Sequence, residues 1–333
     1  MKVLFIGGTG LISTAVTKLS SKRDMDLYIL NRGNRNHDLP DHVHPIQGDI
    51  YDVDNMKKIL NDLSFDVVVE WIGFTVEHVM RDYTLFKGKT KQYVFISTAA
   101  AYVKPVPFLP VTEDTPLGNQ YWEYGRNKQK CEEYLMNLND PSFHVTIIRP
   151  SHTYDDRALI FQIPNYAYPY TLLYRMIHDL PIVLVGDGNT KWTLTHHEDF
   201  AEAFLDILGN EKTYHQAYHL TSEFVYTWNE ITMSLYNALS KQPNIIYLPY
   251  EIIEKHFPEF EGALIGDNMN DAIFDNSKIK KVTPHYQSTI DYRDVAKKAV
   301  FYYLNHLEAQ VIDESYMKRY DDLVKEYNNI MKK

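Results

Sequence analysis

The chain has 333 residues, of which 44% are hydrophobic and 23% are charged, and these proportions indicate a folded globular protein with a sizeable core. The formal net charge of -10 argues against a nucleic-acid partner, because RNA and DNA surfaces need concentrated Lys and Arg. No apolar run approaches the ~20 residues of a membrane span, and the first residues carry no signal-peptide pattern. Cys131 is the only cysteine, which excludes an intramolecular disulfide. We therefore expect a cytoplasmic protein without a membrane partner.

Short apolar runs rich in branched residues alternate with segments of helical period in the first part of the chain. Strands are expected at Val3 to Ile6, Leu27 to Leu30, Val43 to Ile46, Val67 to Val69, Tyr93 to Ile96 and Val145 to Ile148. Such alternation predicts an α/β fold of the Rossmann type, with a doubly wound parallel sheet and helices on both faces.

The composition changes after Pro150, where tyrosines and prolines become frequent. We expect residues 1–150 to form an NAD(P)-binding Rossmann domain. Residues 151–333 are expected to form a smaller α/β substrate-binding lobe with C-terminal helices, interleaved with the Rossmann core around 180–222. Expected elements in this part are strands at 182–185, 218–221 and 245–248 and helices near 197–209 and 227–240. The last helix carries an apolar stripe from Ile312 to Ile330, which packs either on the body or on a second subunit.

A glycine turn follows the first strand, with the pattern Gly7-Gly8-Thr9-Gly10-Leu11-Ile12-Ser13. Glycine lets the backbone bend tightly, and it lets a pyrophosphate approach the amide groups at a helix N-terminus. The turn therefore predicts a dinucleotide site that includes Gly7, Thr9, Gly10, Leu11 and Ile12. The alternative is an ordinary turn from strand to helix.

Dinucleotide sites carry an acid for the adenosine ribose, or basic groups for a 2′-phosphate, about 20 residues further on. This chain has Asn31, Arg32 and Arg35 there. Because guanidinium groups pair with phosphate and no carboxylate is present, NADP is expected in preference to NAD. The alternative interpretation is that Arg32 and Arg35 are solvated charges of a surface loop with no role in cofactor binding.

Gly48-Asp49-Ile50 follows the third expected strand. Two interpretations are open for this segment. In one, the Asp49 carboxylate accepts a hydrogen bond from the adenine amino group and Ile50 covers the ring. In the other, Asp49 is the cap of the next helix.

A tyrosine and a lysine stand four residues apart in a helical segment, at Tyr124 and Lys128, so both side chains lie on one helix face. An ammonium near a phenol stabilises the phenolate and brings the pKa of the tyrosine toward the range useful for proton transfer. Tyr124 is predicted to be the general acid or base, with Lys128 as its electrostatic partner and a ribose ligand. A hydroxyl that orients the reacting oxygen is expected from Ser97-Thr98 at a strand end, with Thr98 the better candidate.

Several ordered motifs together resemble the extended short-chain dehydrogenase/reductase family, the NAD-dependent epimerase/dehydratase group. The resemblance rests on the GGTGLIS turn, Gly48-Asp49, the FISTAAAY segment at 95–102, the YGRNK helix, Ile148-Arg149-Pro150, and Gly186-Asp187-Gly188 leading to His196-His197. It implies a Rossmann domain with a small C-terminal substrate domain, a nicotinamide cofactor, and Thr98, Tyr124 and Lys128 as the catalytic residues. It also implies a homodimer formed through the helix of the Tyr-xxx-Lys motif and a neighbouring helix.

Departures from the family pattern bear on the substrate. Sugar 4,6-dehydratases of the family carry an Asp-Glu pair after the threonine, where this chain has Ala99-Ala100. The arginine that binds the diphosphate of nucleotide sugars is replaced by Trp192, beside Lys191, and a usual asparagine is replaced by His152. A diphosphate loses its bidentate partner by these changes, and Trp192 is able to stack on a sugar ring.

The function predicted from these residues is an NAD(P)-dependent oxidoreductase or epimerase that acts on a hydroxyl or carbonyl of a sugar-like molecule, with Ser97, His152, Lys191 and Trp192 near the substrate. One alternative is an NDP-sugar 4-epimerase whose diphosphate is held by Lys191 and His152. A second alternative is a catalytically silent NAD(P)-binding protein with a regulatory or RNA-binding role. No metal site is expected, because the adjacent His196 and His197 point in different directions.

Overall fold

The computed structural model describes residues 1–332 and contains a seven-stranded parallel sheet. The strand order is β10-β6-β5-β4-β1-β2-β3. In chain order the strands are β1 (Lys2–Ile6), β2 (Asp26–Asn31), β3 (His44–Gln47), β4 (Phe65–Glu70), β5 (Thr90–Ile96), β6 (His144–Pro150) and β10 (Gln216–Leu220). The predicted α/β class and Rossmann-type sheet are confirmed.

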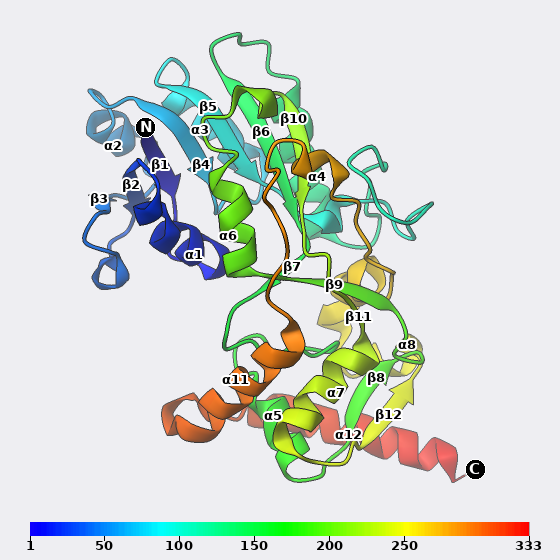
Figure 1. The fold of residues 1–333 in the computed structure, drawn as a ribbon. Helices are drawn as coiled ribbons and strands as arrows, with labels where there is room; N and C mark the ends of the chain where they lie inside the picture. Colours follow the sequence, from blue (N-terminus) through cyan, green and yellow to red (C-terminus); the bar gives the residue numbers. More distant parts are fainter. Residues whose placement is uncertain (333) are drawn as a thin grey trace.

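Helices cover both faces of this sheet (Figure 1). On β1, Val3 and Phe5 belong to the core on one face, whereas Leu4 and Ile6 belong to the core on the other. The first core includes α1 (Leu11–Leu19) and α6 (His197–Leu205), and the second includes α2 (Val53–Ile59), α3 (Val76–Phe86) and α4 (Glu123–Met136). The near-continuous apolar character of the strands follows from burial on both faces.

The order of the strands reverses beside β1, which pairs with β2 on one side and with β4 on the other. In doubly wound sheets, ligands bind in the crevice at the carboxyl ends of the strands where the order reverses. The glycine turn after β1 therefore lies at the position where this fold binds nucleotides.

Two smaller sheets are built from later parts of the chain. One has the order β11-β9-β7, with β7 (His152–Tyr154), β9 (Lys191–His196) and β11 (Val225–Thr227), and the other pairs β8 (Ile182–Val185) with β12 (Ile245–Leu248). The strands expected at 182–185 and 245–248 are confirmed, whereas β7 and β11 were not predicted. Because β10 pairs with β6, the chain returns to the large sheet after it has formed part of the smaller ones.

The remaining helices lie mostly around the smaller sheets. They are α5 (Tyr170–Ile177), α7 (Trp228–Leu239), α8 (Tyr250–Ile253), α9 (Glu261–Ala263), α10 (Ser277–Lys280), α11 (Tyr292–Asn305) and α12 (Glu314–Met331), with a π-helical turn at Leu264–Asn268. The stripe of α12 packs on the body, because Tyr316, Tyr320 and Leu323 are buried in the same core as α5, α7 and α11. Figure 1 shows α12 running across the end of the molecule opposite the large sheet. Within residues 1–332, every helix is too short or too polar to cross a membrane.

Candidate active site

Thr98 and Tyr124 line the same cavity, which has a volume of about 360 Å³. Thr98 directly follows β5, and Tyr124 lies in the first turn of α4, so a strand end and a helix start supply the two hydroxyl groups. The other lining residues come from the α4 start, from the β6–β7 segment, from Tyr166, from β9 and from the segment 267–274: Ala99, Ala100, Trp122, Pro150, Ser151, His152, Thr153, Tyr166, Trp192, Thr193, Asp267, Asn268, Ala272 and Phe274.

The approach of α4 to the turn after Thr98 depends on Gly125. A Cβ atom at Gly125 would lie 2.4 Å from the backbone oxygen of Ala100, so only glycine fits there. Asn119 adds a second connection, because its side-chain amide donates to the backbone oxygens of Ala100 and Gly266, both at 2.7 Å. Its carbonyl oxygen accepts from the backbone N–H of Trp122 at 3.0 Å. Asn119 thus joins three segments of the cavity wall, and sequence analysis did not identify it.

Lys128 lies behind the cavity and is only 2% exposed. Its Nζ donates to the backbone oxygens of Gly73 at 2.7 Å and Ile96 at 2.6 Å, and it lies 5.9 Å from the centroid of the Tyr124 ring. Burial of the ammonium lowers the pKa of Lys128 to about 8. The structure therefore brings Thr98, Tyr124 and Lys128 together in one region.

The pKa of the Tyr124 phenol moves in the direction opposite to that predicted. Burial raises the pKa above the ordinary value, a hydrogen bond from Thr98 opposes this increase, and the nearby Asp267 carboxylate adds to it. The expectation that Lys128 would make the phenol more acidic is wrong for this geometry, because desolvation of the phenolate is the larger effect. Tyr124 is accordingly a neutral phenol at physiological pH.

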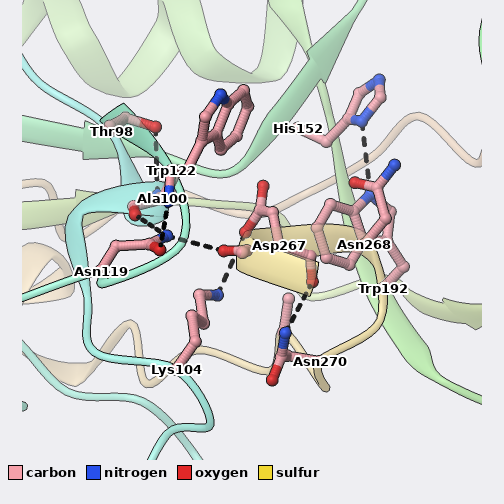
Figure 2. Close-up of polar contacts among 12 residues, drawn as sticks. Thr98, Ala100, Lys104, Asn119, Trp122, His152, Trp192, Asp267, Asn268 and Asn270 are labelled. Atoms are coloured by element: carbon pink, nitrogen blue, oxygen red, sulfur yellow. Dashed lines mark hydrogen bonds and ion pairs between the residues drawn. The ribbon is translucent and has the colours of Figure 1, made fainter. Parts of the chain in front are cut away.

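Two of the four predicted substrate residues line the cavity, and their side chains contact each other. Trp192 Nε1 donates to His152 Nδ1 at 3.3 Å (Figure 2). Burial lowers the pKa of His152 to about 4, so the ring is neutral, and Nε2 carries its proton because Nδ1 accepts from Trp192. Trp192 is 3% exposed and stacks on Trp228 with centroids 5.4 Å apart, so most of its ring surface is used in the core.

Ser97 and Lys191 do not reach the cavity. The Ser97 hydroxyl is buried and donates to the Glu132 carboxylate of α4, so it is not directed into the cavity. Lys191 is exposed at the start of β9, and its backbone N–H donates to Asp271 at 2.7 Å. These two placements correct the substrate roles expected for Ser97 and Lys191.

A carboxylate that sequence analysis missed lies in the cavity wall. Asp267, in the π-helical turn, accepts a hydrogen bond at Oδ1 from Lys104 Nζ at 3.1 Å. Lys104 is 3% exposed and comes from the loop after β5. Asp267 belongs to no motif and lies far from Tyr124 in the sequence, so only the folded chain brings the two together.

The glycine turn has the backbone that a dinucleotide site requires. Gly7 and Gly8 have φ angles of +98° and +101°, and a Cβ atom at Gly8 would lie 2.8 Å from Ile29 Cδ1. Gly10 is the N-cap of α1, and its N–H donates to Ser13 Oγ at 2.9 Å. Leu11 and Ile12 begin the helix, so their amides lie at its positive end. The serine that replaces the third glycine, Ser13, is buried.

The segment after β2 is polar and open. The Asn31 side-chain oxygen accepts from the Gly33 N–H at 2.7 Å, and its Nδ2 is buried without a hydrogen-bond partner in residues 1–332. Arg32 is exposed, whereas Arg35 Nη1 donates to the backbone oxygen of Thr9 at 3.0 Å. The chain thus holds Arg35 against the glycine turn, and an unpaired donor at Asn31 remains where the fold binds a ribose.

Asp49 and Ile50 lie at the end of β3. Asp49 Oδ1 accepts from the Tyr51 N–H at 3.0 Å, whereas the cap of α2 is Asp52, which accepts from Asn55 at 3.2 Å. The capping interpretation of Asp49 is therefore wrong. Ile50 is 4% exposed in the core beneath the sheet, so it offers little surface to an adenine ring.

The adjacent histidines begin α6. His196 Nδ1 accepts from the Glu198 N–H at 3.3 Å, and His197 Nδ1 lies 3.0 Å from the backbone oxygen of Leu11. Among residues 1–332, no group of three or more His, Cys, Asp or Glu side chains is arranged to hold a metal ion.

Comparison with known proteins assigns the chain to a family. The chain matches the model of the NAD dependent epimerase/dehydratase family over residues 3–85 and 72–220. The chain belongs to this family. The match spans the glycine turn, Thr98, Tyr124, Lys128 and His152, so it includes both the nucleotide-binding edge and most of the cavity wall.

Relatives within and near the family have different functions. The chain is 24% identical to a 2'-dehydrokanamycin reductase of Streptomyces kanamyceticus, over 86% of this chain and 80% of the relative. It is 26% identical to the chloroplast stem-loop binding protein of 41 kDa b of Arabidopsis thaliana, over 74% of this chain and 65% of that protein. The fold is shared with the UDP-glucose 4-epimerase of Bifidobacterium longum, solved with NAD+ and UDP, at a TM-score of 0.70 and 18% identity, over 93% of this chain and 100% of that one.

Proposed function

We propose that this family member is an NAD(P)-dependent oxidoreductase or epimerase that acts on a hydroxyl or carbonyl group of a sugar-like molecule. The observation that carries the proposal is that Thr98 and Tyr124 line one cavity, with the Lys128 ammonium behind the tyrosine. A neutral phenol is suited to donate a proton to a carbonyl oxygen, and the phenolate that remains accepts a proton back when a hydroxyl is oxidised.

The chain's own residues supply the proton chemistry. Thr98 would hold the reacting oxygen beside the Tyr124 hydroxyl, and Lys128 would stabilise negative charge that develops on the phenol as its proton leaves. His152 offers an Nε2–H donor on the opposite side of the cavity, which would orient a second hydroxyl of the substrate.

The residues around the glycine turn fit a nicotinamide dinucleotide. Gly7, Gly8 and Gly10 form the turn that precedes α1, where a pyrophosphate would accept hydrogen bonds from backbone amides, and Asn31 has an unpaired donor for a ribose hydroxyl. When bound, the nicotinamide supplies or accepts the hydride. We further propose a preference for NADP, supported by the exposed Arg32 and Arg35 and by the absence of a carboxylate in the segment from Asn31 to Arg35.

A nucleotide-sugar 4-epimerase is less well supported by this cavity. That alternative requires Lys191 and His152 to hold a diphosphate, but Lys191 lies outside the cavity and His152 is neutral. A non-catalytic RNA-binding role is favoured only by the likeness to the stem-loop binding protein. The net charge of -10 opposes that role.

Tyr124→Phe tests the proposal. We expect this variant to bind NADPH with unchanged affinity, measured by energy transfer from tryptophan to the cofactor, and to lose turnover by ~10²- to 10⁴-fold, because a general acid is removed. Turnover is followed by NADPH consumption on a panel of keto sugars. Tyr121→Phe is the matched control, since Tyr121 is exposed, lies three residues earlier and does not line the cavity.

Retention of full turnover in Tyr124→Phe would refute the proposed role of Tyr124. Titration of the unchanged protein with NADPH and with NADH tests the cofactor preference, which is refuted if NADH binds more tightly. Binding of neither cofactor, or binding of cofactor without turnover on any substrate of the panel, would favour the non-catalytic alternative.

A further inference from the structure

The cavity of the proposed active site has one carboxyl group on its wall, that of Asp267. Burial raises the pKa of this carboxyl, and the adjacent Lys104 ammonium opposes the increase. Asp267 lies on the wall formed by the π-helical turn, and its charge acts on the Tyr124 phenol. Within residues 1–332, no Lys or Arg side chain lines this cavity. The proposal below rests on the proposed function and concerns the chemistry of its substrate.

Asp267 is held so that one oxygen remains available. Oδ1 accepts from Lys104 Nζ at 3.1 Å, whereas Oδ2 has no hydrogen-bond partner in residues 1–332. Figure 2 shows Lys104 on one side of the carboxylate, with the second oxygen directed away from Lys104, toward the space between Trp122 and Asn268. The Asp267 side chain is 19% exposed, and the Lys104 side chain is 4% exposed. A ligand in the cavity would therefore meet the carboxylate and not the ammonium.

The backbone around Asp267 is fixed from two directions. The Gly266 oxygen accepts from Asn119 Nδ2 at 2.7 Å, and the Asn270 side chain donates to the Ile265 oxygen at 2.7 Å. Gly266 also packs against Trp122, since a Cβ atom at this glycine would lie 3.0 Å from Trp122 Cβ. These contacts hold the carboxylate in place before a ligand binds, which reduces the ordering cost of recognition.

We propose that the cavity selects a sugar that carries a free amino group, with the substrate ammonium bound by Asp267 Oδ2. An ammonium would form a charge-assisted hydrogen bond with this oxygen, and the faces of Trp122 and Tyr166 offer a further attraction for a cation. A nucleoside diphosphate would meet the Asp267 carboxylate, and within residues 1–332 no Lys or Arg side chain lines the cavity to offset the desolvation of its phosphates. The volume of about 360 Å³ is near the lower limit of ~300–1,000 Å³ for small-molecule sites, which suits a sugar better than a nucleotide sugar.

The experiment compares three disaccharides that share one β-1,4-linked skeleton. They are the glucosamine disaccharide with two free amines, its N-acetylated counterpart, and cellobiose, which has hydroxyl groups at these positions. Binding to the full-length protein with NADPH is measured by calorimetry at low salt, and UDP-glucose is the anionic comparison. We expect the diamine to bind at least ten times more tightly than the other three ligands, and to lose this advantage as the salt concentration increases.

Asp267→Asn is the matched variant, because asparagine keeps the shape and leaves an oxygen for Lys104. We expect the variant to lose the tenfold preference for the diamine and to retain NADPH binding. The proposal is overturned if UDP-glucose binds more tightly than the diamine, if the unchanged protein binds the diamine and the N-acetylated sugar equally, or if the preference survives in Asp267→Asn. The first two outcomes need no variant, so a folding defect would not prevent the test.

Failure of this inference is distinguishable from failure of the proposed function. Calorimetric binding requires no turnover, so an inactive protein that prefers the diamine would support the amine site while refuting the oxidoreductase. A protein that reduces neutral keto sugars through Tyr124 without a preference for amines would support the enzyme and refute the amine site.

Discussion

At the residue scale, the pH dependence of the reaction should report Lys128. Burial lowers the pKa of Lys128 to about 8, so the ammonium loses its proton as the pH rises through that value. Tyr124 stays protonated over the same range, because burial raises its pKa. Since the proposed reduction uses the protonated phenol and the charged lysine together, kcat/KM for carbonyl reduction should fall above pH ~8.

NADPH consumption measured from pH 6 to 10 would check this profile. We expect Lys128→Met to be slower by ~10-fold or more at pH 7 and to lack the decrease near pH 8, because the titrating group is gone. Lys130→Met is the control, since Lys130 is exposed two residues later on the same helix. If Lys128→Met shows the same decrease in kcat/KM near pH 8, the group that titrates there is not Lys128.

The sequence predicts the location of a side chain well where helix spacing or a strand end alone determines that location. The four-residue spacing of Tyr124 and Lys128 places both side chains on one helix face, and the end of β5 places Thr98 at the nucleotide-binding edge. Ser97 was misplaced because its hydroxyl is used in a buried hydrogen bond to Glu132, a contact that its position after β5 does not reveal. Asp267 and Asn119 were missed because their positions depend on contacts between segments that are distant in the sequence.

At the scale of elements, the contact between α4 and the turn after β5 depends on Gly125. Alanine is normally more favourable than glycine inside a helix by ~1 kcal/mol. Here the added Cβ would lie 2.4 Å from the Ala100 oxygen, which is backbone and has little freedom to move. We expect Gly125→Ala to lower the free energy of unfolding by about 1–3 kcal/mol and to separate Thr98 from Tyr124, with reduced turnover.

Urea unfolding and NADPH-dependent turnover would measure both effects of Gly125→Ala. Gln129→Ala is a suitable control, because the Gln129 side-chain amide donates a hydrogen bond to Glu133 on the exposed surface of the same helix. A variant with higher stability and unchanged turnover would show that helix propensity outweighs the close contact.

Strands with a continuous apolar run were predictable, whereas the short strands between the two parts of the molecule were not. β8 and β12 have the branched residues expected of buried strands. β7 and β11 have three residues each, and their pairing with β9 is set by the surrounding fold. The intrinsic preference of three residues for β structure is weak, so tertiary contacts decide whether such a segment forms a strand.

At the scale of the whole molecule, the cavity lies between the large sheet and a hydrophobic core of the smaller lobe, and this core includes residues of α12. Trp192 and Leu264 belong to the same core as Tyr316, Tyr320 and Leu323 of α12, and Leu264 begins the turn that carries Asp267. The stability of the C-terminal helix should therefore affect one wall of the cavity, although α12 itself does not line it.

Arg175 is the residue through which this connection is most easily tested. Its guanidinium is 1% exposed, donates to Asp321 Oδ1 at 2.6 Å and lies 4.4 Å from the centroid of the Tyr320 ring. Asp321→Asn would leave the buried guanidinium without its anionic partner, and Asp321 is 46% exposed, so water replaces part of the lost interaction. We expect the free energy of unfolding to fall by ~1–2 kcal/mol, a cost typical of weakening a hydrogen bond to a charged group.

Thermal unfolding followed by circular dichroism would measure this loss, and Asp322→Asn is the control because its partner Lys325 lies with it on the exposed face of α12. We expect Asp322→Asn to change stability by less than ~0.5 kcal/mol, as is usual for exposed pairs. Equal stability of the two variants would show that α12 contributes little through Arg175. In that case the buried rings of Tyr316 and Tyr320 would remain the main contacts that hold the helix on the smaller lobe.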